Sequence, residues 1–322
     1  MAIPYVTEHD PRYGEVVEVA PLVRRVTAHN PGRFSGWGTG TYIVGRGEVA
    51  VVDPGPTLNS HRTALEAALE GETVTTILVT HCHSDHSPLA TWLKERSGAP
   101  TVCFGPHVFD PDWVEDDTDP YEFDAEDMAA IAEAVADGAT EEGHDRDFRP
   151  DITVGDGDIA ARGEGWTISA LHTPGHTSNH TCYYLREQQL LFSGDHVMGW
   201  STSVITPPDG NMRDYLASLA KVRDLAPAAL YPTHGSPVTD PVPFVDAYIA
   251  HRLDRERNIL AALGDGLTLI PDIVTRLYVD VNPKLYRAAA RSVLAHMIKL
   301  VGDGLVRHEG PQPGVKTRYF LT

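Results

Sequence analysis

The chain has 322 residues, 42% of them apolar, which suits one large domain and a small one built around a sizeable core. No stretch approaches the roughly 18 uninterrupted apolar residues of a membrane helix. The N-terminus lacks a basic patch followed by an apolar run, so we expect neither a membrane association nor a secretory signal. Three cysteines, odd in number and without paired spacing, favour a reducing, cytoplasmic location over a disulfide framework.

The formal net charge of −19 is spread unevenly. Residues 110–151 carry 17 Asp and Glu against two Arg, whereas residues 251–322 carry 11 Lys and Arg against 7 acids. An acidic body repels polyphosphates at long range. The charge therefore disfavours nucleic acid as a partner, although nucleic-acid binding remains possible.

The first hundred residues alternate predicted strands and helices. β-Branched runs at 22–30 and 74–81, and a hairpin over 38–55, are typical of strands. Helical spacing predicts helices over 59–72, capped by Asn59 or Ser60, and 87–98, ended by Gly98. The stretch "THCHSDHSP" lies between the last strand and the second helix, where open α/β sheets usually bind ligands.

The rest of the chain divides into an insertion, a second set of strands and a C-terminal module. Residues 105–157 form an acidic insertion with a predicted helix at 124–139, either a lid or interface or a solvated flap. Further strands are predicted at 163–177, 180–187, 188–197 and 228–235, and a helix at 212–225. Three helical stretches and a hairpin at 304–322 then follow the order of a winged helix.

We place the domain boundary near residue 245, which gives a large domain at 1–245 and a small, winged-helix-like domain at 246–322. The apolar residues of the third helical stretch, 282–302, run at core spacing, although the stretch also carries Lys284, Arg287, Arg291 and Lys299. We therefore expect domain packing or a homodimer here, in preference to nucleic-acid binding.

Seven side chains form the candidate metal site. His81 and His83, two residues apart on an extended loop, point the same way and can bind one metal ion, while Asp85 and His86 can reach a second. Further ligands are available at predicted strand ends: His176, Asp195 and His234. An aspartate, with two oxygens, is suited to bridging two cations.

With these motifs in this order, the chain resembles the metallo-β-lactamase-fold hydrolases from about Leu22 to Pro237. The resemblance implies an α/β fold, an αββα sandwich. It also implies two Zn²⁺ ions, with Fe or Mn at one or both sites as the alternative. His81, His83 and His176 would hold one ion, Asp85, His86 and His234 the other, and Asp195 would bridge them. Residues 251–322 are similar to the winged-helix module of a β-lactamase-like group that includes a single-strand endoribonuclease and polyketide thioesterases.

The function expected from this resemblance is a dinuclear hydrolase that uses a metal-bridging hydroxide on a small-molecule ester, thioester or lactone. A single-strand endoribonuclease and a mononuclear iron persulfide dioxygenase are the alternatives. Asp85 would orient the hydroxide and relay a proton. We also name His180 and His196 as catalytic candidates that would orient a ligand carboxylate or steady an oxyanion, against the alternative that each packs or faces solvent.

Overall fold

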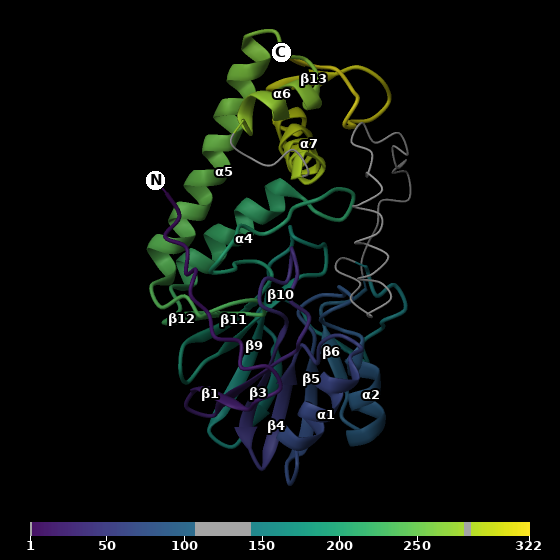
Figure 1. The fold of residues 1–322 in the computed structure, drawn as a ribbon, viewed down its shortest axis with the longest axis vertical. Helices are drawn as coiled ribbons and strands as arrows, with labels where there is room; N and C mark the ends of the chain where they lie inside the picture. Colours follow the sequence, from purple (N-terminus) through teal and green to yellow (C-terminus); the bar gives the residue numbers. More distant parts are fainter. Residues whose placement is uncertain (1, 107–142, 280–284) are drawn as a thin grey trace.

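In the computed structural model, the described residues are 2–106, 143–279 and 285–322. The helix predicted at 124–139, the lid-or-flap alternatives for most of the acidic insertion, and Lys284 lie outside the described residues. The other predicted elements lie within the described residues, apart from 282–284 at the start of the third helical stretch. They assemble into two sheets, flanking helices and a C-terminal module (Figure 1).

Seven strands form the first sheet, in the spatial order of their numbering. Its elements are β1 (Val17–Ala20), β2 (Val23–Thr27), β3 (Gly40–Arg46), β4 (Glu48–Val52), α1 (Asn59–Ala68), β5 (Thr73–Leu78), α2 (Leu89–Ser97), β6 (Thr101–Cys103) and β7 (Ile152–Thr153). Strands β1 to β4 pair antiparallel, whereas β4 to β7 run parallel. Parallel neighbours need a crossover, which α1 and α2 supply. The carboxyl ends of β4 and β5 therefore meet at one edge.

Five strands form the second sheet, in the order β12-β11-β10-β9-β8. Its elements are β8 (Ile159–Gly163), β9 (Trp166–His172), β10 (Thr181–Leu185), β11 (Leu190–Gly194), α4 (Met212–Leu225) and β12 (Ala229–Pro232). Strands β8 to β11 form an antiparallel meander, and β12 joins β11 in parallel after the crossover through α4. As in the first sheet, parallel pairing brings the ends of β11 and β12 to the same edge.

The layers are held together by three hydrophobic clusters. Tyr42, Val44, Trp166 and Phe192 belong to the cluster between the two sheets. A second cluster joins the outer face of the first sheet to α1 and α2, and a third joins the second sheet to α4 and α5 (Pro241–Gly264). The order helix, sheet, sheet, helix confirms the expected αββα sandwich (Figure 1).

The C-terminal module has its own core. It contains α6 (Ile270–Leu277), α7 (Tyr286–Gly302), β13 (Val306–His308) and β14 (Tyr319–Leu321), packed with the second half of α5. The predicted boundary near residue 245 falls inside α5, whose first half packs on the sandwich and whose second half packs on the module. The sandwich and the module are therefore two packing units that share α5. Among the described residues, no helix is both long and apolar enough to cross a membrane.

Candidate metal centre

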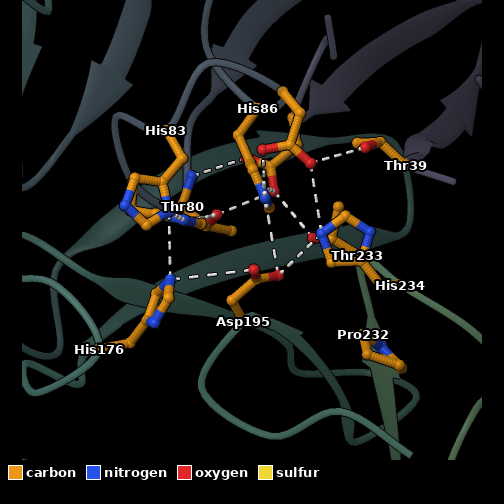
Figure 2. A network of polar contacts seen from close by, with 12 residues as sticks. Thr39, Thr80, His83, His86, His176, Asp195, Pro232, Thr233 and His234 are labelled. Atoms are coloured by element: carbon orange, nitrogen blue, oxygen red, sulfur yellow. Dashed lines mark hydrogen bonds and ion pairs between the residues drawn. The ribbon is translucent and has the colours of Figure 1, made fainter. Parts of the chain in front are cut away.

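The seven predicted ligands come together at the edge where the parallel strands of both sheets end. Figure 2 labels His83, His86, His176, Asp195 and His234 among them. The loop that carries four of them follows β5, and the other three follow β9, β11 and β12. Their ligand atoms fall into three overlapping groups, each with all atoms within 4.8 Å of one another: His81, His83 and His176; His81, His86 and Asp195; and Asp85, His86 and His234.

The first group consists of three ring nitrogens that face a common point. His81 Nε2 lies 2.9 Å from His83 Nδ1, and His176 Nε2 lies 3.2 Å from the same atom. Burial lowers the pKa of all three histidines. They are therefore neutral at pH 7, which is the form of imidazole that binds a metal ion.

The outer nitrogens of four histidines are held by acceptors, which fixes where the ring protons lie. His176 Nδ1 donates to Val204 O (2.6 Å) and His234 Nδ1 to Gly38 O (3.0 Å), because a carbonyl can only accept. His86 Nδ1 donates to the Asp53 carboxylate (2.9 Å), and His81 Nδ1 lies 3.0 Å from Thr80 Oγ1. The Nε2 lone pairs consequently point inward, as in histidines that ligate metals.

We call Asp85, His86 and His234 the second group, and Asp195 lies between it and the first group. Asp85 lies 3.5 Å from His86 Nε2 and 3.3 Å from His234 Nε2. Asp195 Oδ1 lies 3.6 Å from His86 Nε2 and 3.4 Å from His234 Nε2, whereas its Oδ2 faces His176 Nε2 at 3.8 Å. Asp195 thus presents one oxygen to each group, and Thr39 Oγ1 donates to Asp85 Oδ2 (2.8 Å).

The electrostatics of the second group favour positive charge. Burial by itself would lower the pKa of His86 and of His234, but the nearby carboxylates Asp85 and Asp195 outweigh it and raise both. Burial would likewise raise the pKa of Asp195, but His234 and His86 outweigh it and hold that pKa well below its usual range. His86 Nε2 and Asp195 Oδ1 are buried and have no hydrogen-bond partner within the described part of the chain. A divalent cation fits this donor set, since it would satisfy both atoms.

Asp53 supports the site from beneath, although the sequence analysis did not name it. Its buried carboxylate accepts hydrogen bonds from Thr80 N (2.8 Å), Thr80 Oγ1 (2.8 Å), Thr233 Oγ1 (3.0 Å) and His86 Nδ1 (2.9 Å). The residue directly follows β4, in "VVDPG", with φ +49°. Its position as a carboxylate at the end of a buried strand was the available signal, and it ties the β4, β5 and β12 ends together.

A second support missed from sequence is the segment 143–145, within the acidic insertion. It pairs with the histidine loop through Ser84 N to Gly143 O (2.7 Å) and Asp145 N to Cys82 O (2.8 Å). Asp145 Oδ2 accepts from Ser87 Oγ (2.8 Å), and the His144 ring centroid lies 4.9 Å from that of His83. No sequence signal separates these residues from the surrounding acidic run.

The two remaining catalytic candidates lie behind the ligands. His180 is fully buried, and its Nε2 accepts a hydrogen bond from the backbone N–H of Asp195 (3.2 Å), while its Nδ1 pairs with Thr173 Oγ1 (2.9 Å). His196 is also fully buried, and its ring packs against Tyr215 with centroids 5.0 Å apart. Burial lowers the pKa of His196 to about 3. His180 is thus placed to position Asp195, whereas the described contacts of His196 are those of a packed side chain.

Comparison with known proteins agrees with this arrangement. Residues 38–234, which contain all seven candidate ligands, match the Metallo-beta-lactamase superfamily. The chain belongs to this superfamily. Residues 270–312 match the Beta-lactamase associated winged helix domain, which confirms the expected C-terminal module. Together with the His/Asp cluster, the superfamily fold indicates a hydrolase that binds divalent metal.

Relatives resemble the chain over almost its whole length. A Beta-lactamase-like protein 2 homolog from Caenorhabditis elegans is 30% identical over 95% of this chain and 92% of its own. An Atrochrysone carboxyl ACP thioesterase from Aspergillus chevalieri is 30% identical over 97% of this chain and 90% of its own. The solved structure of a metallo-beta-lactamase family protein from Thermus thermophilus has a TM-score of 0.67 at 25% identity, covering 95% of this chain and 100% of its own. A Beta-lactamase domain protein from Burkholderia ambifaria, 23% identical over 99% of this chain and 97% of its own, has the same fold with a TM-score of 0.74.

Proposed function

We propose that the protein is a dinuclear, zinc-dependent hydrolase that cleaves a small-molecule thioester, ester or lactone. The observation that carries this proposal is the orientation of Asp195, which presents Oδ1 to His86 and His234 and Oδ2 to His176. A carboxylate shared between two groups of ligands is the arrangement that a pair of cations requires. The thioesterase named among the relatives supports an acyl substrate.

The chain's own residues then have distinct tasks. When bound, a pair of divalent cations supplies an activated water and polarises the substrate carbonyl. Asp85 is the more exposed of the two carboxylates, with 16% of its side chain exposed against 11% for Asp195. Held by Thr39 Oγ1, it is placed to exchange a proton with the reacting groups. His180 fixes the backbone of Asp195 from behind.

The two alternatives have less support. An endoribonuclease would draw much of its affinity from phosphate neutralisation, yet the chain carries a net charge of −19. A mononuclear iron dioxygenase would need only the first group of ligands, so it leaves the convergence of Asp85, His86 and His234 without a purpose. The three cysteines are buried and none is joined in a disulfide, which is consistent with a cytoplasmic location. A homodimer stays a prediction.

Metal content tests the proposal directly. Protein purified without added metal is analysed for elements, beside His234→Ala and the control His308→Ala, which lies in β13 of the C-terminal module. We expect about two zinc ions per chain in the wild type and the control, and about one in His234→Ala, because only the second group loses a ligand. A single iron per chain, unchanged in His234→Ala, would contradict the dinuclear hydrolase.

Activity is then measured on a thioester, a lactone, single-stranded RNA and a persulfide. The proposal expects hydrolysis of the thioester or lactone, at least tenfold slower in His234→Ala and unchanged in His308→Ala. Cleavage of RNA alone would replace the proposed function with that of an endoribonuclease. Oxygen uptake with the persulfide would replace it with that of an iron persulfide dioxygenase.

A further inference from the structure

Two tryptophans lie beside the second group of ligands, on loops from different sheets. Trp37 immediately precedes Gly38, whose carbonyl accepts from His234, and Trp200 lies in the loop between Asp195 and Val204, whose carbonyl accepts from His176. Their ring centroids are 5.8 Å apart in an edge-to-face arrangement. Both side chains are partly exposed, so part of this aromatic surface remains open to a ligand.

Two glycines make room for this pair next to the metal ligands. A Cβ atom on Gly36 would lie 2.9 Å from the Trp200 ring, and one on Gly235 would lie 2.9 Å from Trp200 and 3.6 Å from Trp37. Both glycines have positive φ, at +59° and +85°. Since Gly235 directly follows His234, the two indoles lie against the backbone that carries a metal-ligand candidate. We call Trp37 and Trp200 the aromatic wall.

The wall is held from outside by residues 3–9, which we call the N-terminal strap. Ile3 packs on the cluster between the second sheet and its helices, and Val6 N donates to Gly199 O (2.8 Å), next to Trp200. The His9 ring packs on Trp37 with centroids 5.4 Å apart. The strap therefore touches the loops of both tryptophans.

A chain of hydrogen bonds fixes His9 in one orientation. Arg25 Nη2 can only donate, so His9 Nε2 accepts from it (3.1 Å) and the ring proton lies on Nδ1. His9 Nδ1 then donates to Ser236 Oγ (2.9 Å), which donates in turn to Glu8 O (2.9 Å). Arg25 Nη1 also donates to Gly235 O (2.8 Å). The same network thus positions His9 against Trp37 and holds the residues that follow His234.

We propose that the N-terminal strap, through His9, sets the aromatic wall beside the second group of metal ligands, and that this wall selects substrates with flat, apolar acyl groups. The inference rests on the proposed acyl hydrolase. Its physical basis is that indole rings contact flat apolar groups over a large area at little entropic cost, and favour aromatic partners further through their quadrupoles. A short acyl chain such as acetyl offers the indole rings no flat surface to contact.

Ligand binding tests this separately from turnover. The metal-loaded full chain is titrated by calorimetry with 2-naphthoate and with acetate, the products that an aromatic and a short acyl substrate would release. We expect Trp37→Leu to bind 2-naphthoate roughly tenfold more weakly, because one aromatic stacking partner is lost. Its affinity for acetate should be unchanged. Trp37→Phe should retain most of the affinity. His9→Ala, which keeps both indoles but releases the strap, should fall between them.

Trp92→Leu is the matched control, since this tryptophan lies on α2 with Arg62 5.9 Å above its ring. Circular dichroism verifies that each variant is folded. Equal losses for 2-naphthoate and acetate in Trp37→Leu, or no loss in either, would overturn the aromatic wall as a selector. Tight 2-naphthoate binding in a protein that hydrolyses no acyl substrate would instead overturn the proposed function and leave the wall standing.

Discussion

The carboxylate of Asp53 accepts four hydrogen bonds, and both of its oxygens take part. In Asp53→Asn one oxygen becomes an NH₂ group, which would face the donors Thr80, Thr233 and His86 that now meet a carboxylate. We expect zinc affinity to fall about 10- to 100-fold, the usual effect of losing a group that orients a metal ligand. Competition with a fluorescent zinc chelator measures this.

The exposed turn residue Asp158, whose Oδ2 accepts from Gly155 N, supplies the control for that change. Asp158→Asn should bind zinc as the wild type does. Unchanged zinc affinity in Asp53→Asn would mean that Thr80 and Thr233 position His86 without the carboxylate, and the role assigned to Asp53 would be wrong.

At the residue scale, the sequence predicted what local spacing can encode. The pattern of "HCHSDH", with His176, Asp195 and His234 at strand ends, was sufficient to name seven side chains that the fold brings together. Asp53 and Asp145 act through contacts with residues that lie 27 and 58 positions away in the chain, Thr80 and Ser87. Such contacts depend on how the strands and the insertion fold back, which spacing does not reveal.

At the scale of elements, the ends of helices were only partly predictable from the sequence. Gly98 ends α2 in the left-handed conformation, with φ +75°, as predicted. The predicted cap of α1 by Asn59 or Ser60 was wrong, because Leu58 occupies the N-cap position and makes no side-chain capping bond. A left-handed terminus favours glycine, although Ala226 adopts this conformation at the end of α4. An N-cap can instead be left to the backbone turn that precedes it, here Leu58 N to Pro56 O.

Asp151 joins three elements at the edge of the first sheet and makes that edge sensitive to acid. Its Oδ2 accepts from Thr101 N and Thr101 Oγ1 in β6, both at 2.9 Å, and Lys94 of α2 pairs with its Oδ1. The hydrogen bond from Lys94, followed by those from Thr101, lowers the pKa of Asp151 from 3.8 to about 2. Because the folded pKa is depressed, this contribution to stability is present above about pH 4 and is lost as the pH falls toward 2.

Asp151→Asn should therefore lower the urea midpoint at pH 7, and the difference from the wild type should shrink between pH 4 and pH 2. Urea denaturation followed by circular dichroism across this range measures it. Asp147→Asn, at an exposed position nearby, is expected to have no such effect. A difference from the wild type that stays constant down to pH 2 would show that the carboxylate charge is not what holds the edge.

At the scale of the whole molecule, α5 and α7 connect the sandwich and the winged-helix module. Phe244 and Tyr248 of α5 belong to the sandwich-side cluster, and Ile259 belongs to the core of the module. Ion pairs continue the connection, since Asp303 pairs with both Lys299 of α7 and Arg213 of α4. Helical periodicity predicted an apolar face over this stretch but did not reveal that the face passes from one core to the other.

Because α5 packs in both cores, we expect the two units to unfold together. Ile259→Ala leaves a cavity in the module core, where Ile259 is fully buried, at a cost of about 2–5 kcal/mol. All five tryptophans lie at or before residue 200, so their fluorescence reports on the part of the chain outside the module. If the units are coupled, Ile259→Ala lowers the thermal midpoint measured by tryptophan fluorescence as much as the midpoint measured by far-ultraviolet circular dichroism. Leu253→Ala, on the same helix but 40% exposed, should move neither. Two separate steps in the dichroism, with the fluorescence midpoint unchanged, would mean that the module melts by itself and that α5 unwinds between the two cores.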